Sequence, residues 1–268
     1  MQLGLAPLTV GRPEPGVLVD AAASAGFPAV GMTLWAPGAA PSTVCADRGA
    51  CRRLRGQLQT SGVAVTDVGV VVLSPELDRQ ALARLLETGA ALGAGRVIVM
   101  NQDAVAARAA AELAAVCTAA EAAGLDVAVE FMPYTASRTL EDAVALIVAA
   151  ASERAGLMLD VLHLFRSGGS AVTVRGLDPR LLRAVQLCDA RRVAPPPELL
   201  RAESLGDRRY PGEGQLPLVE VLAALPAGLP MTLEAPVARD ARLAPAARAA
   251  SAAAAAGRFL ARLPPRDR

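Results

Sequence analysis

The strongest constraint on this chain is a regular alternation between short apolar segments and longer segments with helical spacing. The apolar segments contain few polar residues, as expected for parallel strands that are covered on both faces. Eight of them are predicted to be strands: Leu3–Leu5, Ala29–Leu34, Val63–Leu73, Arg96–Met100, Asp126–Phe131, Gly156–Leu159, Ala184–Cys188 and Pro230–Glu234.

The intervening segments place apolar residues three and four positions apart, which predicts amphipathic helices. Gly124 and Gly156 end two of these segments just before a strand, and glycine is the usual helix stop. The predicted helices are Val17–Ala25, Cys51–Thr60, Arg79–Leu92, Val105–Ala123, Leu140–Arg154 and Leu218–Leu225, with Arg242–Leu263 as the closing helix.

Eight strand-helix repeats in 268 residues predict an α/β fold, a single (β/α)8 TIM barrel over residues 1–268. An open doubly wound sheet would carry a glycine-rich phosphate loop after the first strand, and residues 7–11 do not form one. Residues 191–215 interrupt the rhythm. Because they are rich in Pro and Gly, we expect a long loop on the face where such barrels carry out chemistry.

Two scarce residue types exclude whole classes of chemistry. All 27 basic residues are Arg, so no lysine is present for a Schiff base with a carbonyl substrate or pyridoxal phosphate. His163 is the only histidine, which excludes His-rich zinc centres. The formal net charge is +1 and no basic stripe occurs, so nucleic acid is not an expected partner.

The four cysteines form no CxxC pair or extracellular framework, and we expect them to be reduced thiols. The amino end lacks the pattern of a secretory leader, and no apolar run reaches about 18 residues. These features predict a cytoplasmic protein with no membrane partner, and they leave open whether the chain forms a homo-oligomer.

Four consecutive predicted strands end in an oxygen-bearing side chain: Glu130, Asp160, Gln186 and Glu234. Any one of them could cap a strand or pair with a helix arginine. Three carboxylates that converge at one rim require a cation between them, because unpaired buried carboxylates are costly to desolvate. The set therefore predicts one divalent metal ion, Mg²⁺ or Mn²⁺ by preference for oxygen, with Co²⁺ as a further candidate.

The chain resembles the xylose isomerase-like TIM barrel family of sugar isomerases and epimerases over nearly its whole length. The resemblance rests on five pieces in this order: Glu130–Pro133, Asp160–His163, Val185–Asp189, Arg208–Gly214 and Leu233–Pro236. It implies that Glu130, Asp160 and Glu234 are metal ligands, and that Glu130 and Glu234 also act as acid and base. It further implies that His163 lies beside the substrate and that Arg208 binds substrate oxygens.

Gln186 departs from the commonest family pattern, in which a histidine is the fourth ligand. Glutamine at this place is similar to the arrangement in some 3-dehydroshikimate dehydratases. An amide oxygen is a harder and weaker donor than imidazole, so it shifts the expected metal preference away from zinc.

A metal-bound hydroxy-carbonyl compound can lose a proton to give an enediolate, which the metal stabilises. We therefore predict a metal-dependent isomerase or epimerase of a small sugar, keto-sugar or cyclitol. Loss of a hydroxyl from the same intermediate makes a lyase, of the 3-dehydroshikimate dehydratase type, the alternative. A non-catalytic barrel that binds a partner is a third interpretation, and a single histidine argues against a phosphodiesterase.

Three further residues are candidates for contact with substrate. Trp35 follows the second predicted strand and could form a stacking wall, or pack at the rim instead. Asn101 follows the fourth predicted strand, and Arg166 lies three residues beyond His163. These positions, with His163 and Arg208, complete the predicted substrate pocket.

Overall fold

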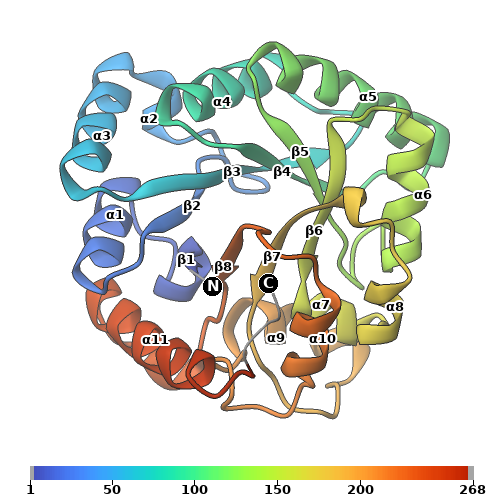
Figure 1. The fold of residues 1–268 in the computed structure, drawn as a ribbon. Coiled ribbons are helices and arrows are strands. Elements are labelled where there is room, and N and C mark those ends of the chain that lie inside the picture. The colour runs from blue at the N-terminus through green and yellow to red at the C-terminus, as the bar shows by residue number, and fades with distance from the viewer. Residues whose placement is uncertain (1–2, 265–268) are drawn as a thin grey trace.

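A computed structural model describes residues 3–264 and shows a closed barrel of eight parallel strands (Figure 1). Each strand pairs with its sequence neighbour, and β1 also pairs with β8. This closure confirms the predicted (β/α)8 TIM barrel. The strands are β1 Gly4–Leu5, β2 Ala29–Thr33, β3 Ala64–Leu73, β4 Arg96–Asn101, β5 Asp126–Glu130, β6 Ala155–Asp160, β7 Leu182–Leu187 and β8 Met231–Leu233.

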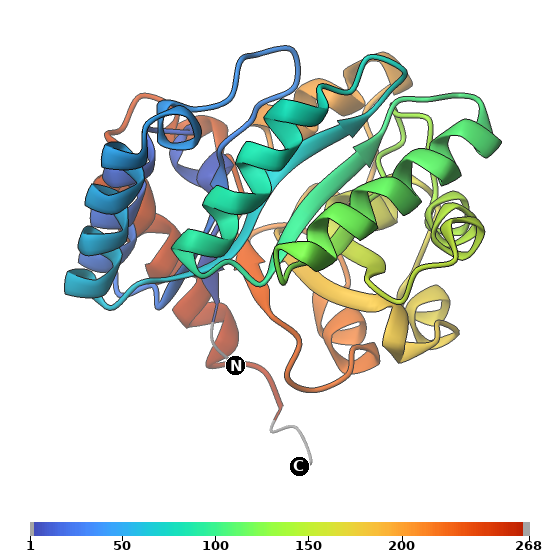
Figure 2. The same cartoon turned by 90° about the horizontal axis from the view of Figure 1, so that it is seen from above.

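Helices surround the barrel, and α11 lies beside α1 where the ring closes (Figure 1). Seen at a right angle, α4 and α5 lie along the outer face of the strands (Figure 2). Within residues 3–264 none of the helices has the length and apolar character needed to cross a membrane. The helices are α1 Pro15–Ser24, α2 Thr43–Ala46, α3 Arg48–Ser61, α4 Arg79–Leu92, α5 Ala106–Ala122, α6 Leu140–Ala150, α7 Val161–Arg166, α8 Ala171–Arg175, α9 Leu200–Gly206, α10 Leu218–Ala224 and α11 Pro245–Leu260, with 3₁₀ turns at Pro7–Val10, Pro179–Leu181, Pro197–Leu199 and Ala238–Asp240.

The sequence-based prediction of helices was wrong in several places: α2 was not predicted, and α9 lies within residues 191–215, which were expected to be a loop. Helix α6 ends at Ala150 and not at Arg154, because Ala151 takes a left-handed conformation with φ of 50°. No helix was predicted between the sixth and seventh strands, yet α7 and α8 lie there. Helix α7 starts on the residue after β6, and Asp160 both ends the strand and caps the helix, so its capping role was hidden in a residue interpreted only as a metal ligand.

Side chains fill the inside of the barrel beneath the carboxyl ends of the strands. Ile98, Ala128, Met158 and Ala184, from β4 to β7, form a small buried cluster with Val70 of β3 packed against it. The barrel is therefore closed by packed side chains, as in other folds of this type. Any ligand must bind above this layer, at the rim.

The buried carboxylate of Asp189 binds several backbone groups of the long loop after β7. Its two oxygens accept hydrogen bonds from the backbone N–H groups of Ala190, Gly212, Gly214 and Leu216, at 2.8 to 3.0 Å. A side chain at Gly214 would overlap Asp189, so glycine is required there. This anchor fixes the path of the segment that carries Arg208.

Replacing Asp189 by Asn is expected to lower the free energy of unfolding by about 2–3 kcal/mol, because an amide NH₂ would face backbone donors that need an acceptor. Urea denaturation monitored by circular dichroism measures the change. Asp207→Asn, at an exposed position in the same loop, is the matched control and should alter stability by less than about 0.5 kcal/mol. Equal stability of the two variants would show that the Asp189 carboxylate does not hold the loop.

Candidate active site

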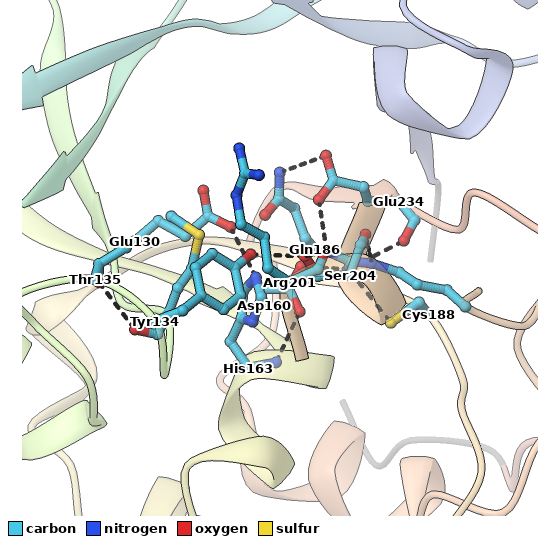
Figure 3. A network of polar contacts seen from close by, with 12 residues as sticks. Glu130, Tyr134, Thr135, Asp160, His163, Gln186, Cys188, Arg201, Ser204 and Glu234 are labelled. Atoms are coloured by element: carbon cyan, nitrogen blue, oxygen red, sulfur yellow. Dashed lines mark hydrogen bonds and ion pairs between the residues drawn. The ribbon is translucent and has the colours of Figure 1, made fainter. Parts of the chain in front are cut away.

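The four predicted ligands come together at the carboxyl ends of four neighbouring strands (Figure 3). Glu130 and Asp160 are the last residues of β5 and β6, and Gln186 is the penultimate residue of β7. Glu234 directly follows β8, where its N–H donates to the carbonyl of Leu187. Each side chain is buried, with at most 8% of the residue exposed.

Asp160 is fully buried and is fixed by two donors. Its Oδ1 accepts the backbone N–H of His163 at 3.1 Å, so the carboxylate also caps the start of α7. Its Oδ2 accepts a hydrogen bond from Nη1 of Arg208 at 2.5 Å. Burial raises the pKa of Asp160, but Arg208 and the other interactions outweigh it, and the net pKa lies below the ordinary value.

Arg208 bridges two of the predicted ligands. Its Nη1 contacts Asp160, and its Nη2 lies 3.3 Å from Oε2 of Glu234. Its Nε donates to the carbonyl of Ser204 at 2.8 Å, which places the guanidinium behind the carboxylates. Burial lowers the pKa of Arg208, but Asp160, Cys188 and Glu234 together outweigh this and keep the pKa well above its usual range. The residue is therefore a fixed positive charge within the site.

The remaining acidic groups are poorly compensated. Burial, with repulsion from Glu234 and Asp160, raises the pKa of Glu130 well above its usual value. Burial likewise raises the pKa of Glu234 to about 7, against the opposing effect of Arg208. Burial lowers the pKa of His163 to about 4, so its ring is neutral at pH 7. Arg208 thus pairs with two of the three buried carboxyl groups, and Glu130 has no arginine partner among residues 3–264.

Two buried atoms without hydrogen-bond partners support a metal site. They are Oε1 of Gln186 and Nδ1 of His163. The possible ligand atoms of Glu130, Asp160 and His163 lie within 4.8 Å of one another, and Nε2 of Gln186 donates to Oε1 of Glu234 at 3.3 Å. Excess negative charge and free acceptors together fit a divalent cation. The structure also places His163 among the groups that could bind it.

The site opens into a cavity of about 250 Å³, the size suited to a small metabolite. Glu130, His163, Gln186, Arg208 and Glu234 all line this cavity. Asp160 lies behind them and is reached only through its neighbours.

The other three candidates have structural contacts of their own. The indole Nε1 of Trp35 donates to the carbonyl of Ala39 at 3.0 Å. The amide of Asn101 donates to Ser137 and accepts the backbone N–H of Asp103. Arg166 forms an ion pair with Glu203 at 2.7 Å. None of the three lines the cavity, and their role in substrate binding stays a prediction.

The lining residues that the sequence analysis missed include four with ionisable side chains: Arg12, Asp67, Tyr134 and Arg201. Asp67 carried a usable signal, since it interrupts the apolar run of β3. Tyr134 lies edge-on to the ring of His163 at 5.7 Å, and its hydroxyl is 2.6 Å from that of Ser204. The two arginines lie in segments without a periodic pattern, so only the folded chain shows that they share the cavity.

The raised pKa values of Glu130 and Glu234 predict an unusual pH dependence. Both groups hold protons in the folded protein that the unfolded chain has released, so stability falls as the pH rises. Between pH 6.5 and 8.5, we expect chelator-treated protein to lose about 1–3 kcal/mol of unfolding free energy. His163 acts in the opposite sense only at lower pH, because its folded pKa of about 4 lies below its unfolded value.

Urea denaturation at the two pH values, with chelator present, tests this expectation. Glu234→Gln should reduce the loss, whereas Glu220→Gln, on the exposed face of α10, should leave it unchanged. Saturating divalent ion should remove the loss, since the bound cation favours the ionised carboxylates. Stability that rises over this pH range in the chelated protein would contradict the assignment of buried, uncompensated carboxyl groups.

Comparison with known proteins assigns the chain to a family. Residues 19–262 match the sequence profile of the xylose isomerase-like TIM barrels. The protein therefore belongs to the xylose isomerase-like TIM barrel family, as the five sequence pieces predicted. No curated protein sequence matches this chain.

Solved structures of this fold superpose over almost the whole chain. A protein called IOLI, with a bound zinc atom, is 18% identical, with a TM-score of 0.78 over 97% of this chain and 96% of its own. D-psicose 3-epimerase from Clostridium cellulolyticum H10 is 15% identical, with a TM-score of 0.72 and coverage of 97% and 99%. The probable 3-DHS dehydratase AsbF from Bacillus anthracis is 14% identical, with a TM-score of 0.72 and coverage of 93% and 97%. At these identities the likeness shows the fold alone.

Proposed function

We propose that this protein is a divalent-metal-dependent isomerase or epimerase of a small sugar, keto-sugar or cyclitol. The observation that carries the proposal is the excess of buried acid at the rim: Arg208 forms ion pairs with Asp160 and Glu234, and Glu130 has no arginine partner among residues 3–264. The unpartnered Oε1 of Gln186 faces the same group of residues (Figure 3). Oxygen donors predominate in this set, which favours Mg²⁺ or Mn²⁺.

The residues of the site can take separate roles in the proposed reaction. A bound divalent ion would polarise the carbonyl of a hydroxy-carbonyl substrate. Glu130 and Glu234 lie on either side of Gln186, and their raised pKa values let each hold or release a proton near neutral pH (Figure 3). One takes a proton from the carbon beside the carbonyl, and the resulting enediolate regains a proton at the neighbouring carbon or on the opposite face.

His163 and Arg208 support this exchange from the cavity wall. Neutral His163 lies with its Nε2 3.8 Å from Oε1 of Glu130, where it can hydrogen-bond a substrate hydroxyl without adding charge. Arg208 offsets part of the negative charge and holds Asp160 and Glu234 in place. Its buried position makes it a fixed element of the site.

A dehydratase of the 3-dehydroshikimate type is the second candidate, and Gln186 is the observation that favours it. The glutamine stands where many family members have histidine, and its amide lies 3.3 Å from Glu234. Proton removal followed by loss of a β-hydroxyl needs the same acid and base as epimerisation. The likeness in fold to a probable 3-DHS dehydratase is consistent with this alternative.

Hydrogen exchange in heavy water tests the proposal whichever product forms. Manganese-loaded protein is incubated in D₂O with a panel of ketoses, keto-cyclitols and 3-dehydroshikimate, and deuterium beside the carbonyl is measured by mass spectrometry. Deuterium incorporation with a changed sugar or cyclitol supports the isomerase or epimerase. An aromatic ultraviolet band from 3-dehydroshikimate supports the dehydratase. Exchange no faster than in Glu130→Gln with every compound would contradict both.

A further inference from the structure

Two arginines at the cavity have side chains that form no hydrogen bond or ion pair within the described part of the chain. Arg12 and Arg201 both line the cavity, and both side chains are exposed. Across residues 3–264, neither guanidinium forms an ion pair or a hydrogen bond to another group. Arg208, in contrast, is fully engaged with carboxylates. The two free guanidinium groups are therefore available to a ligand.

Arg12 lies in the loop after β1, and its backbone is strained. Its φ is 52°, in the left-handed region, and its N–H donates to the carbonyl of Pro7 at 2.8 Å. A non-glycine residue in this conformation costs of the order of 1 kcal/mol or more, and such strain concentrates at functional sites. Although Gly11 precedes it in the same conformation, the chain places an arginine here and not a second glycine.

Arg12 also contributes to the electrostatics of the acid and base. Burial raises the pKa of Glu234, and the guanidinium of Arg12, with that of Arg208, opposes the rise. Arg12 and Glu234 also line the same cavity, so one ligand can contact both.

Arg201 approaches the cavity from the long loop after β7. It lies in the first turn of α9, on the helix that also provides Ser204 and precedes Arg208. Figure 3 shows its side chain extending toward the side of the site occupied by the carboxylates of Glu130 and Glu234. Arg12 and Arg201 therefore reach one cavity from segments almost 190 residues apart in sequence.

The charges of the cavity leave these two arginines in excess. A divalent ion together with Arg208 would offset the three carboxylates of Glu130, Asp160 and Glu234. Asp67, the other lining acid, accepts a hydrogen bond from Thr66, and one negative charge there is fewer than the two positive charges of Arg12 and Arg201. Because the metal-loaded site would be positive on balance, an anionic ligand would match it better than a neutral one.

The remaining walls are part polar and part apolar. Met32, Ile98, Met100 and Met132 line the cavity with apolar side chains. A hydroxyl that faces these apolar side chains would find no hydrogen-bond partner there, which costs binding energy. A ligand with fewer hydroxyls and one anionic group would bury its apolar carbons there and direct its charge to the arginines.

We propose that Arg12 and Arg201 bind an anionic group, a carboxylate or a phosphate ester, carried by the substrate of this site. The inference rests on the proposed function, since it assigns the substrate class of the same cavity. The two guanidinium groups bind the anion at the cavity mouth, and the reacting carbons are thereby held near Glu130 and Glu234. Charged hydrogen bonds of this kind are the strong ones in such recognition.

Matched ligands that differ in charge test the proposal by calorimetric titration of manganese-loaded protein. The phosphate arm compares D-fructose 6-phosphate with D-fructose, and the carboxylate arm compares shikimate with myo-inositol. We expect at least one anionic ligand to bind about tenfold or more tightly than its neutral partner, with an affinity that falls as salt is added. The arm that shows the preference identifies the anion.

Variants assign the preference to the two residues. Arg12→Gln and Arg201→Gln should each weaken binding of the preferred anionic ligand about tenfold or more, with little effect on a neutral ligand. Arg55→Gln, at an exposed position of α3 on the outside of the barrel, is the matched control and should bind like the unaltered protein. The proposal would be overturned by equal affinity for charged and neutral ligands, or by no binding of either anion. It would also be overturned by wild-type affinity in a variant that carries both Arg12→Gln and Arg201→Gln.

Metal analysis of the same samples separates failure of the anion-binding proposal from failure of the proposed function. Protein that holds about one divalent ion per chain but shows no preference for anions contradicts only the substrate class. Protein that fails to retain a divalent ion contradicts the metal-dependent function itself.

Discussion

Glu130→Gln is expected to abolish turnover while making the metal-free protein more stable. Deuterium exchange into the substrate should fall by about 10³-fold, because the variant loses both a ligand charge and a group that transfers protons. The amide keeps the shape of the side chain but removes a carboxyl that burial and two neighbouring acids disfavour in its ionised form. At pH 8.5 with chelator, the free energy of unfolding should therefore rise by about 1–2 kcal/mol.

The combination of lost activity and gained stability is the informative outcome. Isotope exchange followed by mass spectrometry gives the rate, and urea denaturation gives the stability. Glu220→Gln, the exposed control on α10, should change neither quantity. A Glu130→Gln variant that exchanges protons at the unaltered rate would remove Glu130 from the mechanism. A variant that unfolds more easily in chelator would contradict the proposed excess of buried negative charge at the site.

Replacing Arg208 by Met is expected to have the largest effect on stability. The variant leaves Asp160 and Glu234 buried without their shared cation, and loss of one partner from a buried ion pair typically costs about 3–5 kcal/mol. Arg208→Lys keeps the charge but cannot bridge both carboxylates from a single planar group, so its loss should be intermediate. Urea denaturation of chelator-treated protein at pH 7.5 measures both variants.

Added metal separates an electrostatic role for Arg208 from a packing role. Because a divalent ion supplies positive charge to the same carboxylates, saturating Mn²⁺ should stabilise Arg208→Met more than it stabilises the unaltered protein. Arg175→Met, at an exposed position on α8, controls for the loss of a guanidinium elsewhere. A stability loss in Arg208→Met that is the same with and without Mn²⁺ would mean that the residue acts only by packing.

The sequence predicted those parts of the molecule whose physical cause is local. The apolar runs identify the eight strands because both faces of each strand are covered. A polar residue that ends such a run must lie at the rim, so Glu130, Asp160, Gln186 and Glu234 could be predicted together.

Features set by long-range packing could not be predicted in this way. Arg208 was expected to bind substrate oxygens, but its bridge between Asp160 and Glu234 depends on a loop path that Asp189 fixes from outside the site. Trp35 and Asn101 follow strand ends as the metal-site residues do, yet their polar groups bond to nearby loop atoms. A position at the end of a strand therefore predicts that the residue lies at the rim of the barrel, but it does not predict the direction of the side chain.

Glu130, Asp160, Gln186 and Glu234 are proposed to bind one divalent ion. Anomalous diffraction from a manganese-soaked crystal tests this metal site most directly. We predict a single strong anomalous peak at the carboxyl ends of β5 to β8, with oxygens of all four side chains at about 2.0–2.3 Å from it. A peak bound by His163 in place of Gln186, or no peak at this rim, would contradict it.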